Sequence, residues 1–234
     1  MKLLSSYHNY EYQIDIVTHK KKEGIKYAFY FLDGQNAFKD KFATYHKSLR
    51  AKKIINLLNK PYLAVAIYSP KNDDRYSMYT PFPLDFVNND TTFCKAFIKD
   101  FKDKIIPTCE KDFKIKKRYL ITSSLATIPA LLVNELFCSI AFFSNAFFLN
   151  YEEVLKLIRP NKDTFNFICV GGNESSDGKY NQKEYLEASQ WYYYLCKERK
   201  MPAKLYVDLL GEHSEVSWRK YLKLFIKQIK KDEK

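Results

Sequence analysis

Glycine is scarce in this chain of 234 residues, and its absence from the middle excludes two common kinds of nucleotide site. Only six glycines occur, and none lies between residues 35 and 170. The GxGxxG turn of dinucleotide-binding folds and the P-loop both need glycine, because only glycine lets the backbone approach the phosphates closely. We therefore expect no nucleotide-binding turn in that stretch and no organic cofactor.

The few cysteines form no pattern that indicates a disulfide framework or a metal site. They are odd in number and widely spaced, without any CxxC pair: Cys94, Cys109, Cys138, Cys169 and Cys196. This usage is typical of reduced cysteines in the core of an intracellular protein. We expect free, buried thiols and no bound metal.

Long apolar runs are also missing. The most apolar region, residues 125–149, is interrupted by Pro129, Glu135 and Asn145, whereas a transmembrane helix needs about 20 consecutive apolar residues. The first residues, MKLLSSYHNYEYQ, contain no apolar segment of the kind found in secretory signals. We therefore expect no membrane span and a cytoplasmic protein.

Arginine is rare although the chain is basic. The formal net charge is +12, but only six of the 39 basic residues are arginines, and most lysines are scattered along the chain. Proteins that read bases or clamp phosphates favour the bidentate guanidinium group. A solvated lysine surface is the better interpretation, and we expect no nucleic-acid partner.

What the chain has in abundance is apolar and aromatic side chains. They exclude a disordered chain, and 234 residues are enough for one domain with its own core. No internal repeat or linker divides the sequence. We expect residues 1–234 to form a single domain.

Alternating short and long apolar segments predict an α/β domain. The expected strands span residues 12–18, 25–32, 61–69, 118–122, 138–143, 165–170 and 204–210, and the expected helices span residues 93–113, 125–135, 152–158, 182–199 and 214–229. We expect the first two strands to pair antiparallel around Gly24 and the first helix to bend at Pro107. Strands separated by helices predict a mostly parallel central sheet with helices on both faces.

Three loops that follow predicted strands carry residues suited to catalysis, at the sheet edge where open α/β folds place their sites. The loop Asp33-Gly34-Gln35-Asn36 turns sharply and presents backbone N–H groups. Ser124 stands between a strand and a helix, where a serine can expose its hydroxyl on a strained elbow and the following N–H, that of Leu125, can help to bind an oxyanion. His213 follows the last strand. Taken singly, each loop is more often an ordinary turn, a helix cap or an exposed histidine.

An acid lies between this serine and this histidine in chain order. Glu174 follows the strand 165–170 in the loop GGNE, with Asp177 and Asp208 as alternatives. Asp208 is the weakest candidate because it falls within a predicted strand. The order serine, acid, histidine is that of α/β-hydrolases, in which the histidine is the general base and the acid orients it.

These segments resemble the esterase family of α/β-hydrolases that includes esterase D-like, feruloyl and siderophore esterases. The resemblance extends from about residue 25 to the end and rests on YFLDGQNAF, RYSMYTPF, RYLITSSLAT, FFSNAF, GGNE and GEHSEVSW. In that order they are similar to the family's oxyanion loop, its R…EY-T-P-F segment, its serine elbow, a strand end, its acid loop and its histidine loop.

The resemblance implies an α/β-hydrolase fold and a carboxylic-ester hydrolase acting on a small-molecule ester through an acyl-enzyme. Carried across by position, Ser124 is the nucleophile, Glu174 the orienting acid and His213 the base. The backbone N–H groups of Gln35 and Leu125 form the oxyanion hole, with Gly34 as an alternative to Gln35. Trp218 matches an aromatic residue that follows the family's histidine, and we expect it to pack behind the site.

The serine elbow departs from the family pattern. Thr122, Ala126 and Thr127 stand where the family has glycines, which are small because strand and helix pass closely beneath the serine. A bulky, β-branched Thr122 is the hardest to fit. A catalytically inactive binding protein of the same fold, or an acyltransferase with the same acyl-enzyme, is therefore the alternative to an esterase. We also allow for a homo-oligomer.

Overall fold

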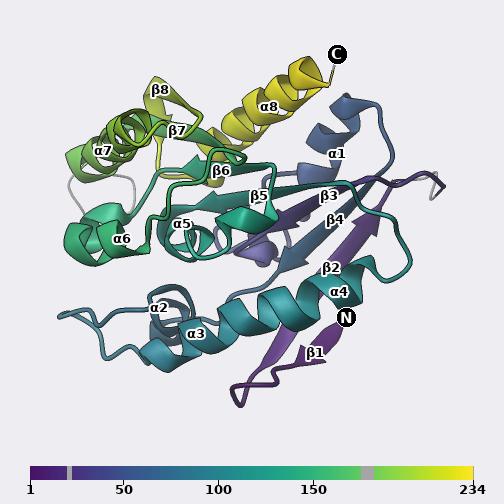
Figure 1. The fold of residues 1–234 in the computed structure, drawn as a ribbon, viewed down its shortest axis with the longest axis horizontal. Coiled ribbons are helices and arrows are strands. Elements are labelled where there is room, and N and C mark those ends of the chain that lie inside the picture. The colour runs from purple at the N-terminus through teal and green to yellow at the C-terminus, as the bar shows by residue number, and fades with distance from the viewer. Residues whose placement is uncertain (20–22, 175–181, 234) are drawn as a thin grey trace.

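The structure is a computed structural model that describes residues 1–19, 23–174 and 182–233. Within these residues one eight-stranded sheet has the order β1-β2-β4-β3-β5-β6-β7-β8 (Figure 1). The strands are β1 (Lys2–Leu4), β2 (Glu11–Thr18), β3 (Tyr27–Phe31), β4 (Tyr62–Ile67), β5 (Lys117–Ser123), β6 (Ser139–Phe143), β7 (Phe165–Asn173) and β8 (Ala203–Glu212). From β4 to β8 all neighbours pair parallel, which confirms the predicted mostly parallel sheet.

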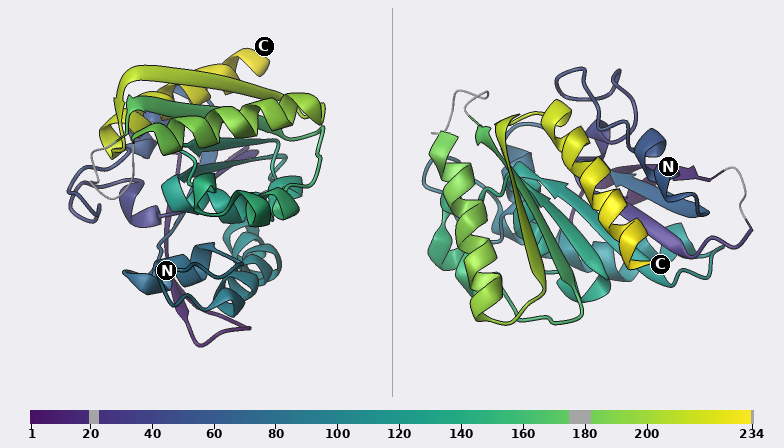
Figure 2. Two further views of the ribbon diagram at one scale, coloured as in Figure 1. Left: turned by 90° about the vertical axis from the view of Figure 1, so that its left-hand side faces the viewer. Right: turned by 90° about the horizontal axis from the view of Figure 1, so that it is seen from above.

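Helices cover both faces of the sheet, as predicted. The α-helices are α1 (Ala51–Ile55), α2 (Asp73–Tyr79), α3 (Thr91–Asp100), α4 (Ile106–Glu110), α5 (Thr127–Ala130), α6 (Tyr151–Leu157), α7 (Gln182–Glu198) and α8 (Glu215–Asp232). In Figure 1, α1 and α8 lie above the sheet and α3 and α4 below it, and α8 crosses the strands in the right-hand view of Figure 2.

Two apolar cores result from the alternation of side chains along each strand, because successive residues point to opposite faces. Tyr30, Leu120 and Ile140 belong to the core that packs against α3, α5, α6 and α7. Their chain neighbours Phe31 and Ile121 belong to the core that packs against α1 and α8. Burial on both faces makes the central strands continuous apolar runs.

The expected antiparallel pair of the first two strands is wrong. β4 lies between them: it pairs antiparallel with β2, through Ile14 and Ile67, and parallel with β3, through Tyr27 and Tyr62. All six residues of β4 are buried, whereas exposed and buried residues alternate at the start of β2. A strand that is apolar on both faces therefore takes the inner position, and the half-polar strand lies near the edge.

The expected helix over residues 125–135 is broken into short pieces. A 3₁₀ turn, η4 (Ser124–Ala126), leads into the four residues of α5, and a second 3₁₀ turn, η5 (Asn134–Leu136), follows. Pro129 has no N–H to donate to the carbonyl of Leu125, so a regular α-helix cannot continue back through the elbow.

A proline also interrupts the regular helix before residue 113. A π-helical segment, η3 (Phe101–Ile105), separates α3 from α4, and Pro107 is the second residue of α4. The chain is thus helical from Thr91 to Glu110, with its irregularity close to the predicted bend.

The five cysteines are free, and four of them are buried as predicted. The prediction is wrong for Cys138, which is exposed because it precedes β6 at the amino edge of the sheet. Among the described residues no group of three or more histidine, cysteine or acidic side chains could hold a metal ion. No helix within the same residues has the length and apolar character needed to cross a membrane.

Candidate active site

Ser124 lies at the carboxyl end of β5, a central strand of the sheet, where it begins the 3₁₀ turn η4. Its φ angle is 54°, in the left-handed region that a residue with a side chain occupies at a cost of about 1–2 kcal/mol. A strained backbone at a strand-to-helix turn presents the side chain at the top of the sheet, as in a nucleophile elbow.

His213 reaches this serine from the loop between β8 and α8. Its Nε2 atom lies 3.0 Å from the Oγ atom of Ser124, and its Nδ1 atom lies 2.7 Å from the Oε2 atom of Glu174. A carboxylate can only accept a hydrogen bond, so Nδ1 carries the proton toward Glu174 and Nε2 is left to accept the serine proton. His213 thus lies within hydrogen-bonding reach of both Ser124 and Glu174, three residues predicted from three separate loops.

Glu174 is completely buried, and donors surround its carboxylate. The Oε1 atom accepts hydrogen bonds from the Gly171 N–H at 2.6 Å and from the Ser144 hydroxyl at 2.8 Å, while Oε2 faces His213. A buried carboxylate is stable only when it is hydrogen-bonded in this way. Of the alternative acids, Asp208 pairs with Lys220 at 3.5 Å, and Asp177 lies outside the described residues.

Two further side chains build the surroundings of this acid and base. Ser144 is fully buried directly after β6, and its Oγ atom accepts a hydrogen bond from the indole N–H of Trp218 at 2.9 Å. The Trp218 ring also packs edge-on against the His213 ring, in agreement with the expected place behind the site, and the Tyr185 ring packs against the His213 ring at a centroid distance of 4.2 Å. Sequence reasoning missed Ser144, although its position at a strand end is the same signal that singled out Ser124.

The loop after β3 is shaped for donating backbone N–H groups. A Cβ atom at Gly34 would lie 2.5–2.7 Å from backbone atoms of Ala66 and Ile67, so only glycine fits. The N–H groups of Asn36 and Ala37 close the 3₁₀ turn η1 (Gly34–Asn36) by binding the carbonyls of Asp33 and Gly34. Within the described residues the turn leaves the N–H of Gln35 without an acceptor.

Leu125 offers a second N–H at the same edge. The turn η4 is closed by the N–H of Thr127, which binds the carbonyls of Ser124 and Leu125. In the described part of the chain the N–H of Leu125 itself has no acceptor. β3 and β5 are paired neighbours and both loops follow their carboxyl ends. The two N–H groups assigned to an oxyanion hole therefore come from adjacent strand ends beside the serine.

The threonines that replace the elbow glycines are accommodated by hydrogen bonds. The Thr122 hydroxyl donates to the carbonyl of Ala141 on the neighbouring strand β6 at 2.8 Å, which directs this side chain sideways along the sheet. The Thr127 hydroxyl donates to the carbonyl of Ser124 itself at 2.6 Å. Ala126 is fully buried, so its single methyl fits beneath the turn.

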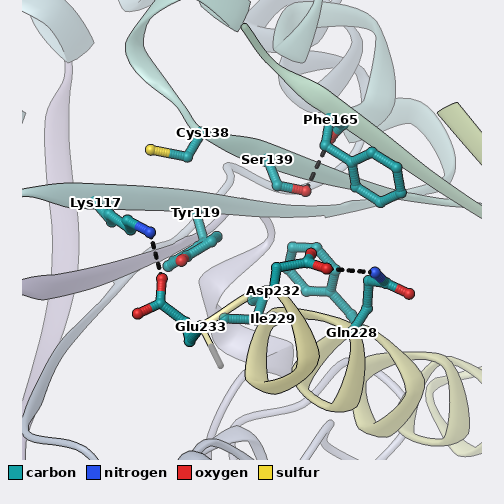
Figure 3. A pocket seen from close by; sticks show the side chains of 10 residues that line it. Lys117, Tyr119, Cys138, Ser139, Phe165, Gln228, Ile229, Asp232 and Glu233 are labelled. Carbon is teal, nitrogen blue, oxygen red and sulfur yellow. Dashed lines mark hydrogen bonds and ion pairs between the residues drawn. The ribbon is translucent and has the colours of Figure 1, made fainter. Parts of the chain in front are cut away.

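A cavity of about 120 Å³ lies at the opposite, amino edge of the sheet (Figure 3). It opens between the first residues of β5, β6 and β7 and the end of α8, and it is lined by Lys117, Tyr119, Cys138, Ser139, Phe165, Phe225, Gln228, Ile229, Asp232 and Glu233. No histidine lines it to activate the Cys138 thiol. At the carboxyl edge, by contrast, His213 lies within hydrogen-bonding distance of the Ser124 hydroxyl.

Solved structures resemble this protein, whereas sequence comparisons find no match. None of the protein-family models matches the chain, and no curated protein does. Among solved structures, the BES protein from Bacillus cereus has a TM-score of 0.72 at 20% identity, covering 97% of this chain and 93% of that one.

Two other solved structures are similar to the same extent. An IroE-like serine hydrolase from Shewanella oneidensis has a TM-score of 0.76 at 17% identity, over 99% of this chain and 79% of that one. The siderophore hydrolase EstA from Aspergillus nidulans has a TM-score of 0.75 at 14% identity, over 99% and 93%. At these identities the likeness establishes architecture, and the expectation drawn from the sequence motifs is confirmed at that level: the chain has the α/β-hydrolase fold, in the form found in siderophore and feruloyl esterases.

Proposed function

We propose that this protein is a serine hydrolase that cleaves carboxylic esters through a covalent acyl-enzyme. The observation that carries the proposal is the continuous hydrogen-bonded series from Ser124 Oγ through His213 to Glu174, with distances of 3.0 and 2.7 Å. Nucleophile, base and orienting acid at such distances are what acyl transfer requires. Fold stability alone does not call for this set.

In the first half of the reaction, the Ser124 Oγ atom attacks the acyl carbonyl carbon while His213 Nε2 takes the serine proton. Glu174 accepts the Nδ1–H hydrogen bond, which holds the imidazole in the right tautomer and stabilises the imidazolium. The N–H groups of Gln35 and Leu125 bind the developing oxyanion. The imidazolium then protonates the leaving alcohol, and the acyl group stays on the serine.

In the second half, water attacks the acyl-enzyme with His213 again acting as the base. The tetrahedral intermediate collapses, the imidazolium returns its proton to Ser124, and the carboxylic acid leaves. His213, Glu174 and the two backbone N–H groups therefore act in both halves, while Ser124 is the nucleophile in the first and the leaving group in the second; no cofactor takes part in the scheme.

The names of the similar structures indicate which esters to assay first. They include siderophore hydrolases, a ferulic acid esterase and an enterobactin esterase. We propose siderophore, ferulic acid and enterobactin esters as candidate substrates, with short p-nitrophenyl esters as general probes.

Hydrolysis of p-nitrophenyl acetate and butyrate tests the proposal directly. We expect turnover by the wild type, and a loss of about three orders of magnitude or more in kcat for Ser124→Ala and for His213→Ala. Retention of wild-type hydrolysis by either variant would contradict the assignment. Addition of acceptor alcohols tests the acyltransferase alternative, because transfer would yield a new ester in place of the free acid.

The inactive binding protein is the weaker alternative. The missing elbow glycines favour it, but the hydrogen bonds of Thr122 and Thr127 support an elbow that keeps its shape without them. A well-folded wild type without any ester hydrolysis would favour this alternative over the esterase.

A further inference from the structure

An ion pair adjoins the loop that carries the Gln35 N–H. The Asp33 carboxylate is almost completely buried and receives two hydrogen bonds from Arg75, from Nε at 2.9 Å and from Nη2 at 2.6 Å. Arg75 belongs to α2, and the hydroxyl of Tyr79 on the same helix accepts the Asp33 N–H at 2.9 Å. Three hydrogen bonds thus tie one residue of the loop to one short helix.

Asp33 needs such support because its backbone is strained. Its φ and ψ angles are 52° and 49°, in the left-handed region, and no side-chain cap of the turn compensates for this. The ψ angle of Asp33 sets the direction in which the following peptide enters the turn. Relaxation of Asp33 would therefore displace the N–H groups of Gly34 and Gln35.

The opposite side of the loop is held independently. The Gln35 side chain donates from Nε2 to the Ser69 hydroxyl at 2.9 Å and accepts the Ser69 N–H at 3.2 Å. Gly34 packs against the backbone of Ala66 and Ile67, where no larger residue fits. With α2 on one side and the end of β4 on the other, the loop has little freedom to relax.

α2 also contacts the turn η4, which begins with Ser124. The helix therefore touches both strand ends from which the proposed oxyanion donors come. The guanidinium of Arg75 in turn lies over the ring of Tyr79, at 5.5 Å from its centre, so the two contacts to Asp33 support each other.

We propose that Arg75 and Tyr79 are positioning residues for the oxyanion hole: by fixing Asp33 they hold the Gln35 N–H where the developing oxyanion needs it. This inference rests on the proposed function. Loss of one oxyanion donor typically lowers kcat by about 10²–10³-fold, and a displaced donor loses part of that contribution. Arg75 acts through Asp33 in this arrangement, so its loss affects kcat rather than substrate binding.

Kinetics of Arg75→Lys and Tyr79→Phe test the proposal with a p-nitrophenyl ester. Lysine cannot make the bidentate contact, and phenylalanine keeps the ring but removes the acceptor for the Asp33 N–H. We expect kcat to fall about 10–100-fold for Arg75→Lys and several-fold for Tyr79→Phe, with KM within about twofold of wild type. Asp33→Asn, which keeps a residue tolerant of left-handed backbone, should fall between them.

The chain offers a matched control in a second bidentate pair far from the site. Arg118 donates to Glu110 from Nε at 2.8 Å and from Nη2 at 2.7 Å. Arg118→Lys should lower the melting temperature and leave kcat and KM unchanged. This comparison separates positioning from a general loss of stability.

Three outcomes would overturn the inference. A raised KM with unchanged kcat in Arg75→Lys would make Arg75 a substrate contact, and wild-type kinetics in both variants would make the ion pair structural only. If Arg118→Lys lost as much kcat as Arg75→Lys, the effect of Arg75→Lys would come from a general loss of stability and not from positioning of the loop. If circular dichroism shows that Arg75→Lys does not fold, the kcat and KM of Tyr79→Phe test the inference in its place. Absence of hydrolysis by the wild type would refute the proposed function instead.

Discussion

Ser144 donates a hydrogen bond at 2.8 Å to the Oε1 atom of Glu174, and this contact connects the end of β6 to the acid after β7. Trp218 donates in turn to the Ser144 hydroxyl at 2.9 Å. The carboxylate that faces His213 is therefore oriented from behind by residues of two other elements. Its orientation decides the direction in which the imidazole points.

Ser144→Ala should reduce kcat/KM about tenfold or more. A hydrogen bond to a charged group contributes about 1.5–3 kcal/mol, and its removal leaves a buried carboxylate with one donor fewer. Steady-state kinetics on a p-nitrophenyl ester measure the effect. Wild-type kinetics in this variant would show that the Gly171 N–H alone is enough to hold Glu174.

Trp218→Phe should have a smaller effect of the same kind, because it keeps a ring against His213 but removes the N–H that binds Ser144. We expect kcat/KM to fall several-fold. Trp191, the other tryptophan, packs against Phe147 and Tyr151, so Trp191→Phe is the matched control. An equal loss in both variants would speak against a specific role of the Trp218 N–H.

Thr127→Val tests the elbow that lacks its glycines. The variant keeps the shape of the side chain and removes the hydrogen bond to the Ser124 carbonyl. We expect the free energy of unfolding to fall by about 1 kcal/mol and kcat to fall several-fold, because the turn that presents the nucleophile loosens. Urea unfolding and ester hydrolysis measure the two quantities.

Thr122→Val provides the comparison, since its hydroxyl binds the carbonyl of Ala141 and not the serine. It should cost about as much stability, about 1 kcal/mol, and leave kcat within about threefold of wild type. If Thr122→Val impaired catalysis as strongly as Thr127→Val, the bond to Ser124 would have no special importance.

Acid stability depends on Glu233, beside the cavity at the amino edge (Figure 3). Although desolvation raises the pKa of this carboxyl, hydrogen bonds from Lys117, Tyr27 and Lys60 outweigh it and lower the pKa from an ordinary 4.5 to about 2. Because folding lowers the pKa of Glu233, its ionised carboxylate stabilises the folded state above pH 4.5. This stabilisation is lost as the pH falls from 4.5 toward 2.

Glu233→Gln should therefore melt roughly 2–4 °C below wild type at pH 7, and the difference should shrink toward zero near pH 2. Hydrolysis at pH 7 should not change, because the residue lies at the edge opposite Ser124. Glu11→Gln is the control, since the ion pair of Glu11 with Lys2 is exposed. A difference in melting temperature that stays constant from pH 7 to pH 2 would contradict the assignment to Glu233.

Glu215 has the opposite effect on stability. It is almost completely buried at the start of α8, and desolvation, together with the charge of Asp33, raises the pKa of its carboxyl above the ordinary 4.5. As the pH rises above 4.5, the Glu215 carboxyl loses its proton in the unfolded state before it does so in the folded state. Folding therefore becomes less favourable as the pH rises. Glu215→Gln should raise the melting temperature at pH 8 and leave it unchanged at pH 4. A variant that is less stable at pH 8 would show that the carboxylate is needed.

The sequence predicted Ser124, Glu174 and His213 because a simple geometric rule applies to them. Each follows a predicted strand, and parallel strands bring their carboxyl ends to one edge, so chain order together with strand ends is enough. The same rule located the loop with Gln35. The rule also applies to Ser144, which directly follows β6, but its role depends on where the Trp218 indole lies after α8 has packed.

Other features could not be predicted because long-range contacts decide them. The pairing of β2 with β4 depends on which of two neighbouring strands is apolar on both faces, not on the turn at Gly24. Residues 125–135 have the apolar periodicity of a helix, but the elbow and Pro129 break it. The pairing of Arg75 with Asp33 joins residues 42 positions apart, and no local pattern signals it.

Labelling with a fluorophosphonate probe, followed by peptide mass spectrometry, tests the central claim most directly, since only a serine activated by its base reacts rapidly. We expect one adduct per chain, located on Ser124, and none in folded Ser124→Ala or His213→Ala. An unlabelled but well-folded wild type, or an adduct on a different serine, would contradict the proposal that Ser124 is the nucleophile.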